Sequence, residues 1–183
     1  MLERYGGVTL FITHKLEEAY RLCPNLVVLT DGRIAGAGTR EAIFRNPPSV
    51  DVARVTECKN FSQARPMNAP WIEALDWNCQ LKVAPQPFPQ PLRDQFYIGI
   101  RAHHIQFPGN LSPENTFPGW LAMVSETQHR VTLYIKLHSK PDSSQDYHLQ
   151  AEVYRDKWHQ LQQRVLPWPI QLASDAVMVM PHE

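Results

Sequence analysis

The sequence predicts two units of different fold class: an α/β segment over residues 1–50, followed over residues 51–183 by an all-β region forming a small antiparallel barrel. Two observations predict this division. Of the 16 prolines, three lie in the first 60 residues and thirteen follow. Because proline neither continues a helix nor donates to a β-ladder, the second unit is restricted to short elements. Its apolar residues also recur mainly with a period of two, which is typical of strands.

The first unit contains alternating strand and helix signals. The expected elements are a buried parallel strand at 8–13, an amphipathic helix at 16–23, a strand at 26–30, a hairpin turn at 31–32, a short strand at 33–35 and a helix capped by Thr39. An α/β unit does not begin with a lone central strand. We therefore expect residues 1–50 to be the end of a larger sheet.

The second unit contains several short alternating stretches. The predicted strands cover 75–83, 97–105, 118–126, 131–138, 147–154 and 170–180, and one helix covers 156–165. In the stretch 131–138 the odd positions are all apolar, which indicates one buried face. Many short strands separated by turn residues predict a small antiparallel barrel.

Composition excludes several classes of protein. The formal net charge is +0 and the pI is about 7.1, which argues against nucleic-acid binding. No apolar run approaches the ~20 residues of a membrane-spanning helix, and no signal peptide is evident. Three distant cysteines and scattered histidines give no disulfide framework and no ligand spacing, so we expect no structural metal and a cytosolic protein. The adjacent His103 and His104 would point to opposite faces of a strand.

The stretch TLFITHKLEEAYRLCPNLVVLTDGRIAGAGTREAIFRNP resembles the last part of the nucleotide-binding domain of ABC-transporter ATPases. The resemblance covers about residues 8–60. It places His14 at the switch histidine, which in the intact parent would contact the γ-phosphate and the catalytic water. Lys15 stands where the family usually has Asp. The resemblance thus implies a catalytic role for His14 in the parent protein only.

Three nucleotide-binding elements of that family do not occur in this sequence: a GxxxxGK[ST] loop, a Leu-Ser-Gly-Gly signature and an apolar strand ending in Asp-Glu. We therefore expect a carboxy-terminal fragment of an ABC ATPase, or a truncated relative. ATP and magnesium would be cofactors of the intact parent, and this chain alone would have none and would not hydrolyse ATP.

The next stretch, RNPPSVDVARVTECKNF at 45–61, resembles the exit from the ATPase domain into the accessory β-barrel (TOBE domain, similar to oligonucleotide-binding barrels) of molybdate, sulfate and sugar importers. The residues Thr56 to Asn60 are most similar to molybdate-transporter ATPases, although Glu57 replaces a usual Gly. Cys58 has no His–carboxylate pair to activate it. We expect a buried structural thiol there rather than a nucleophile.

The barrels of this group bind tetrahedral oxyanions, and LSPENTFPGWLAMV at 111–124 is similar to their Ser-Ala-Arg-Asn-x-x-x-Gly stretch. The similarity implies oxyanion-binding roles for Ser112, Asn115 and the strand residue Lys136. Glu114 replaces the Arg of that pattern and would repel a dianion. The alternative for Lys136 is an ordinary solvated strand lysine.

The favoured hypothesis is the carboxy-terminal regulatory region of an importer ATP-binding subunit for molybdate or a similar oxyanion, with a barrel for dimerisation and substrate sensing. Its partners would be a second copy in a homodimer, membrane permease subunits at the cytoplasmic face of the membrane and a small oxyanion, but no nucleic acid. Two alternatives stay open: a free-standing oxyanion-binding or storage barrel, and a structural dimerisation module without a ligand.

Overall fold

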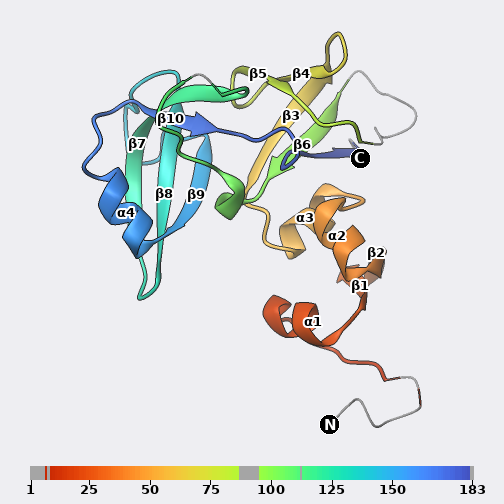
Figure 1. The fold of residues 1–183 in the computed structure, drawn as a ribbon. Coiled ribbons are helices and arrows are strands. Elements are labelled where there is room, and N and C mark those ends of the chain that lie inside the picture. The colour runs from red at the N-terminus through yellow and green to blue at the C-terminus, as the bar shows by residue number, and fades with distance from the viewer. Residues whose placement is uncertain (1–6, 8, 87–94, 112, 182–183) are drawn as a thin grey trace.

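A computed structural model of the chain describes residues 7, 9–86, 95–111 and 113–181 (Figure 1). The elements are α1 (Leu16–Leu22), β1 (Asn25–Thr30), β2 (Arg33–Thr39), α2 (Arg40–Arg45), α3 (Val50–Val55), β3 (Asn60–Pro66), β4 (Trp71–Ala74), β5 (Cys79–Lys82), β6 (Phe96–Ile100), the 3-10 helix η2 (Ala102–His104), β7 (Thr116–Glu126), β8 (Arg130–Leu137), β9 (Leu149–Tyr154), α4 (Arg155–Leu161), β10 (Trp168–Gln171) and β11 (Met178–Pro181). The described part is therefore mostly β, with short helices.

The strands form three sheets, and all their pairings are antiparallel. β1 and β2 form a hairpin, and the larger sheets have the orders β10-β7-β8-β9 and β11-β6-β3-β4-β5. The predicted antiparallel architecture of the second unit is confirmed. The described strands of this unit form two sheets around one core, and closure into the single barrel that we expected stays a prediction. Figure 1 shows the four-stranded sheet on the left and the five-stranded sheet on the right.

One hydrophobic core joins the two large sheets. Buried side chains of both sheets contribute to it, among them Ile98 and Ile100 of β6, Leu133 and Ile135 of β8, and Ile170 of β10. Along β8 the exposure alternates strictly, with Val131, Leu133, Ile135 and Leu137 buried. The period-two pattern of this strand therefore gave the buried face correctly.

The hairpin turn at 31–32 is also confirmed. Asp31 and Gly32 both have positive φ, 48° and 73°, as a two-residue type I′ connection requires. The turn fits the twist of the flanking strands, and Asp-Gly is among the few pairs that adopt it without strain. This local chemistry explains why the hairpin can be predicted from sequence.

The predicted parallel strand at 8–13 is wrong for its described residues. Residues 9–13 have no regular secondary structure, and the side chains of Leu10 and Ile12 are 82% and 87% exposed. An apolar strand of a parallel sheet needs hydrogen-bonded neighbours and cover on both faces. Among the described residues no strand pairs with this segment, so the α/β arrangement expected for 1–50 is not confirmed.

Other boundaries differ because turns interrupt the expected strands. The stretch 75–83 begins with a turn in which Asn78 has φ 49°, and only β5 follows; the stretch 170–180 is split between β10 and β11. The stretch 97–105 leaves the sheet after Ile100 and enters η2. α4 ends at Leu161, so Val165 is exposed and does not extend the apolar face.

α3 connects the first fifty residues to the five-stranded sheet. Its Val52 packs with Val28 and Ile43 of the preceding elements, whereas Val50 and Ala53 pack with Met178 and Met180. The side chains on two faces of one short helix therefore join both groups of elements. The domain boundary at residue 50 stays a prediction, and it coincides with the start of this helix.

Within the described ranges, no helix has both the length and the apolar character needed to cross a bilayer.

Candidate anion-binding site

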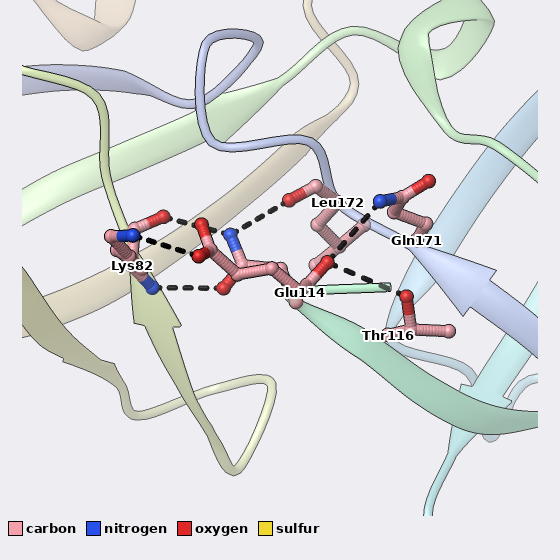
Figure 2. A network of polar contacts seen from close by, with 6 residues as sticks. Lys82, Glu114, Thr116, Gln171 and Leu172 are labelled. Atoms are coloured by element: carbon pink, nitrogen blue, oxygen red, sulfur yellow. Dashed lines mark hydrogen bonds and ion pairs between the residues drawn. The ribbon is translucent and has the colours of Figure 1, made fainter. Parts of the chain in front are cut away.

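Asn115 lies just before β7, at the point where β5 and β10 end. Its backbone has φ 54°, a left-handed conformation that asparagine tolerates better than most residues, and its side chain is 7% exposed. The amide group contacts two other segments of the chain, at Lys82 and at Leu172 (Figure 2). Oδ1 accepts a hydrogen bond from the Lys82 N–H at 2.8 Å, and Nδ2 donates to the carbonyl oxygens of Lys82 at 2.7 Å and Leu172 at 3.0 Å.

This arrangement makes Asn115 a substitute for a strand partner. Its side chain satisfies both backbone groups of Lys82, and its own carbonyl accepts from the Leu172 N–H at 3.0 Å. Both amide hydrogens and the amide oxygen are therefore engaged. An oxyanion at this amide would have to replace a buried hydrogen bond.

The charge of Glu114 is balanced by a lysine, Lys82, that the sequence analysis did not indicate. Its Oε2 lies 2.8 Å from Lys82 Nζ, and its backbone carbonyl accepts from Gln171 Nε2 at 3.2 Å and Thr116 Oγ1 at 3.4 Å (Figure 2). The ion pair is about half exposed, so it contributes little stability. It does balance the negative charge that we expected to oppose an anion here.

Lys136 lies on the outer face of β8 and is paired with a carboxylate. Its Nζ is 2.6 Å from Asp146 Oδ1, and the two side chains are 20% and 29% exposed. The hydrogen bond from Lys136 lowers the pKa of Asp146. Nearby, His148 Nδ1 accepts from the Leu137 N–H at 3.2 Å, and burial lowers the pKa of His148. Lys136 is therefore not simply a solvated strand lysine.

The predicted oxyanion ligands do not share a partner in the described structure. Asn115 is held by β5 and the segment after β10, whereas Lys136 is held by the loop between β8 and β9. Ser112 lies outside the described residues. The anion-binding role of these residues stays a prediction.

His14 is exposed in the segment that precedes α1. Figure 1 shows α1 far from β7 and β8. The turn around it is stabilised by Thr13, whose Oγ1 accepts from the Lys15 N–H at 3.0 Å. The catalytic role of His14 in a complete ATPase is not tested by this arrangement.

The cysteines and histidines give little support to other chemistry. Cys58 is 2% exposed and burial raises its pKa, which confirms the buried thiol; burial also raises the pKa of Cys79 to about 12. His103 and His104 lie in η2, not on a strand, with ring centroids 4.4 Å apart, so our reason for separating them was wrong. No cluster of three or more metal-ligating side chains occurs in the described ranges.

Sequence comparison matches the chain with ATP-binding proteins of importers, while no family model matches. The sulfate/thiosulfate import ATP-binding protein of Bacillus cereus is 27% identical over 186 residues, covering 99% of this chain and 46% of that protein. The spermidine/putrescine import ATP-binding protein of Oleidesulfovibrio alaskensis is 41% identical over 54 residues, or 29% of this chain and 14% of that protein.

Two further comparisons complete this result. The iron(III) import ATP-binding protein of Streptomyces coelicolor is 35% identical over 72 residues, or 37% of this chain and 21% of that protein. The cytoplasmic molybdate-binding protein ModG has a TM-score of 0.47 at 9% identity, over 67% of this chain and 95% of that chain. The matched region spans less than half the length of each curated relative described here. The chain is thus similar in sequence to part of the ATP-binding subunits of importers.

Proposed function

We propose that this chain is the carboxy-terminal regulatory region of an ATP-binding subunit of an ABC importer. The observation that carries the proposal is the match over 99% of the chain with the sulfate/thiosulfate import ATP-binding protein of Bacillus cereus. The order of the elements along the chain also supports it. As the family resemblance implies, the chain contains first the Asp31-Gly32 hairpin, then the helices around residue 45, and then a strand-rich unit after residue 60.

In this proposal the strand-rich unit serves dimerisation and substrate sensing, and the β1–β2 hairpin contributes to the dimer contact. The subunit works with membrane permease subunits and lies at the cytoplasmic face of the membrane. ATP and magnesium bind in the complete ATPase, where His14 would contact the γ-phosphate; the present chain binds neither on its own. The α/β remnant and the TOBE-type barrel belong to this proposal, as does the molybdate-like substrate.

A titration with molybdate, tungstate and sulfate tests the sensing role. Glu114→Arg removes the carboxylate and places a second cation beside Lys82, so we expect tighter anion binding, detectable by calorimetry. Lys136→Ala should weaken binding by about 1.5–3 kcal/mol, the size of a hydrogen bond to a charged group. Exposed Arg33→Gln is the control. If the unaltered chain gives no heat and Glu114→Arg restores none, sensing of these anions is excluded.

The second candidate is a structural dimerisation module without a ligand. It is favoured by one specific observation: the amide of Asn115 and the ammonium of Lys136 already have partners within the chain. The titration above separates the two candidates, because a structural module predicts no anion binding that responds to Glu114→Arg or Lys136→Ala.

Dimerisation is expected because the β1–β2 hairpin exposes an apolar face. Val27, Leu29 and Ile34 are 59%, 62% and 69% exposed, and Leu29 is the cross-strand partner of Ile34. Such a patch marks an interaction surface. Sedimentation should show a species of twice 21.1 kDa at tens of micromolar protein. Leu29→Lys combined with Ile34→Lys should yield the monomer, whereas Val165→Lys should not. A wild-type monomer would contradict the proposal.

A further inference from the structure

A pocket of about 670 Å³ lies where the end of α2 meets the loops after β5, β6 and β10. Its volume is within the range of sites for small molecules. The charged and titratable residues that line it are Arg45, Arg101, His103, His104 and Asp175. Neither Asn115 nor Lys136 lines it, so it is separate from the candidate site described above.

Arg101 is the buried cation of this pocket, with 7% exposure. Its guanidinium donates to the carbonyl oxygens of Phe44 at 2.8 Å and of Thr56, and to Thr56 Oγ1 at 3.1 Å. It also lies over the Phe44 ring, 5.2 Å from the centroid. These carbonyl groups lie at the C-terminal ends of α2 and α3, where the helix dipoles favour a cation. Arg101 therefore holds both helices against the sheet.

The charge of Arg101 is only partly balanced. No carboxylate lies within ion-pair distance of it in the described part of the chain, and the hydrogen bonds named above use three of its five N–H groups. Burial lowers the pKa of Arg101. The charge of Glu57 favours the cation from beyond ion-pair distance, and the hydrogen-bond partners are neutral oxygen atoms. A buried cation without a direct counter-ion is costly, and an anion beside it would offset that cost.

Arg45 adds a second permanent positive charge to the pocket, and the two histidines add charge only when they are protonated. Arg45 reaches the pocket from the last turn of α2 and has no ion pair among the described residues. Burial lowers the pKa of His103 and of His104, and the charge of Arg101 lowers both further. Asp175 is the one carboxylate among the described lining residues. The two arginines therefore outnumber the one lining carboxylate, while Glu57 and Glu152 act on Arg101 and His103 from outside the lining.

We propose that this pocket binds a small oxyanion carrying two negative charges, with Arg101 and Arg45 as its permanent cations and His104 and His103 as donors that strengthen when protonated. The inference goes beyond the proposed function and does not depend on it. A free inorganic oxyanion and the phosphoryl group of a small phosphate monoester share this chemistry. The pocket volume leaves room for either.

The histidines make binding dependent on pH. A dianion favours the imidazolium form, so affinity rises as pH falls toward the lowered pKa values of the two histidines. Other charged groups either act on His103 and His104 or line a pocket together with them. These groups are Arg45, Arg101, Arg130, Glu152, Lys157 and Asp175. Sulfate keeps both charges between pH 5.5 and 8, so a change in its affinity reports on the protein.

Calorimetric titration of the full chain with sulfate tests the proposal. We expect binding to be about fivefold tighter at pH 5.5 than at pH 8. Arg45→Gln should weaken binding about tenfold at both pH values, because a charge-assisted hydrogen bond is lost. His104→Gln should reduce the pH dependence, and Asp175→Asn should tighten binding. Arg45 is exposed, so its replacement leaves the fold intact, unlike that of Arg101.

Two controls separate this pocket from other anion binding. Arg33→Gln removes an exposed arginine elsewhere and should not change sulfate affinity. Lys136→Ala removes the lysine of the other candidate site, so it should leave the component of sulfate binding that depends on Arg45 unchanged. A phosphate monoester, tested as glycerol phosphate, should bind more tightly than sulfate if the natural ligand is organic and no more tightly if it is inorganic. No sulfate binding at pH 5.5, unchanged affinity in Arg45→Gln, or loss only in Lys136→Ala would overturn the proposal.

Discussion

Replacing Asn115 by alanine should lower the free energy of unfolding by about 3–5 kcal/mol. The substitution leaves three backbone groups without their partner, the N–H and C=O of Lys82 and the C=O of Leu172, and each buried unsatisfied group costs about 1–3 kcal/mol. Alanine is also strained at φ 54°. The loss is a large part of the ~5–15 kcal/mol of a typical domain. Urea denaturation measures it.

A second variant separates the two causes. Asn115→Gly tolerates the left-handed backbone but has no amide, so it should retain most of the destabilisation. Asn25→Ala, at an exposed position of β1, is the matched control and should change stability by less than about 0.5 kcal/mol. A loss below about 1 kcal/mol for Asn115→Ala would contradict the prediction, because it would show that these hydrogen bonds contribute little to stability.

The features that could be predicted from sequence are those determined by neighbouring residues. The Asp31-Gly32 turn depends on two residues, and the buried face of β8 depends on a period within eight. The strand expected at 8–13 failed because its stability depends on neighbours in a sheet. Apolar composition indicates what a segment would bury, but not whether the covering elements are present.

The candidate site shows the same limit. The sequence pointed to Asn115, Glu114 and Lys136, but their partners are 33, 32 and 10 residues away along the chain. No spacing rule predicts that Lys82 neutralises Glu114, because strand register determines that contact. The sequence analysis also missed Arg101, because no local sequence pattern indicates that an arginine after a strand is buried. Only the structure shows that the ends of α2 and α3 contact it.

Asn60 provides the second large effect, because it connects the two sheets. It is 2% exposed in β3; its Nδ2 donates to the carbonyl oxygens of Ile100 at 3.0 Å and Gln150 at 2.9 Å, and its Oδ1 accepts from the Gln150 N–H at 2.6 Å. Asn60→Ala should therefore cost about 2–4 kcal/mol, because the N–H and C=O of Gln150 lose their partner, whereas the Ile100 carbonyl still accepts from Cys58 Sγ. The four-stranded sheet then loses this polar link to β3.

Asn60→Asp tests the donor role separately, through pH. The introduced carboxyl group faces two carbonyl oxygens in a buried site, which raises its folded-state pKa above the unfolded value. Its protonated form restores a donor, so the variant should be most stable below the unfolded pKa of about 4 and should lose stability as pH rises through the folded pKa. Urea midpoints at pH 4.5 and 7.5, relative to wild type, should differ for Asn60→Asp but not for exposed Asn25→Asp. Equal differences in the two variants would contradict a buried donor at Asn60, since a solvated carboxylate acquires no raised pKa.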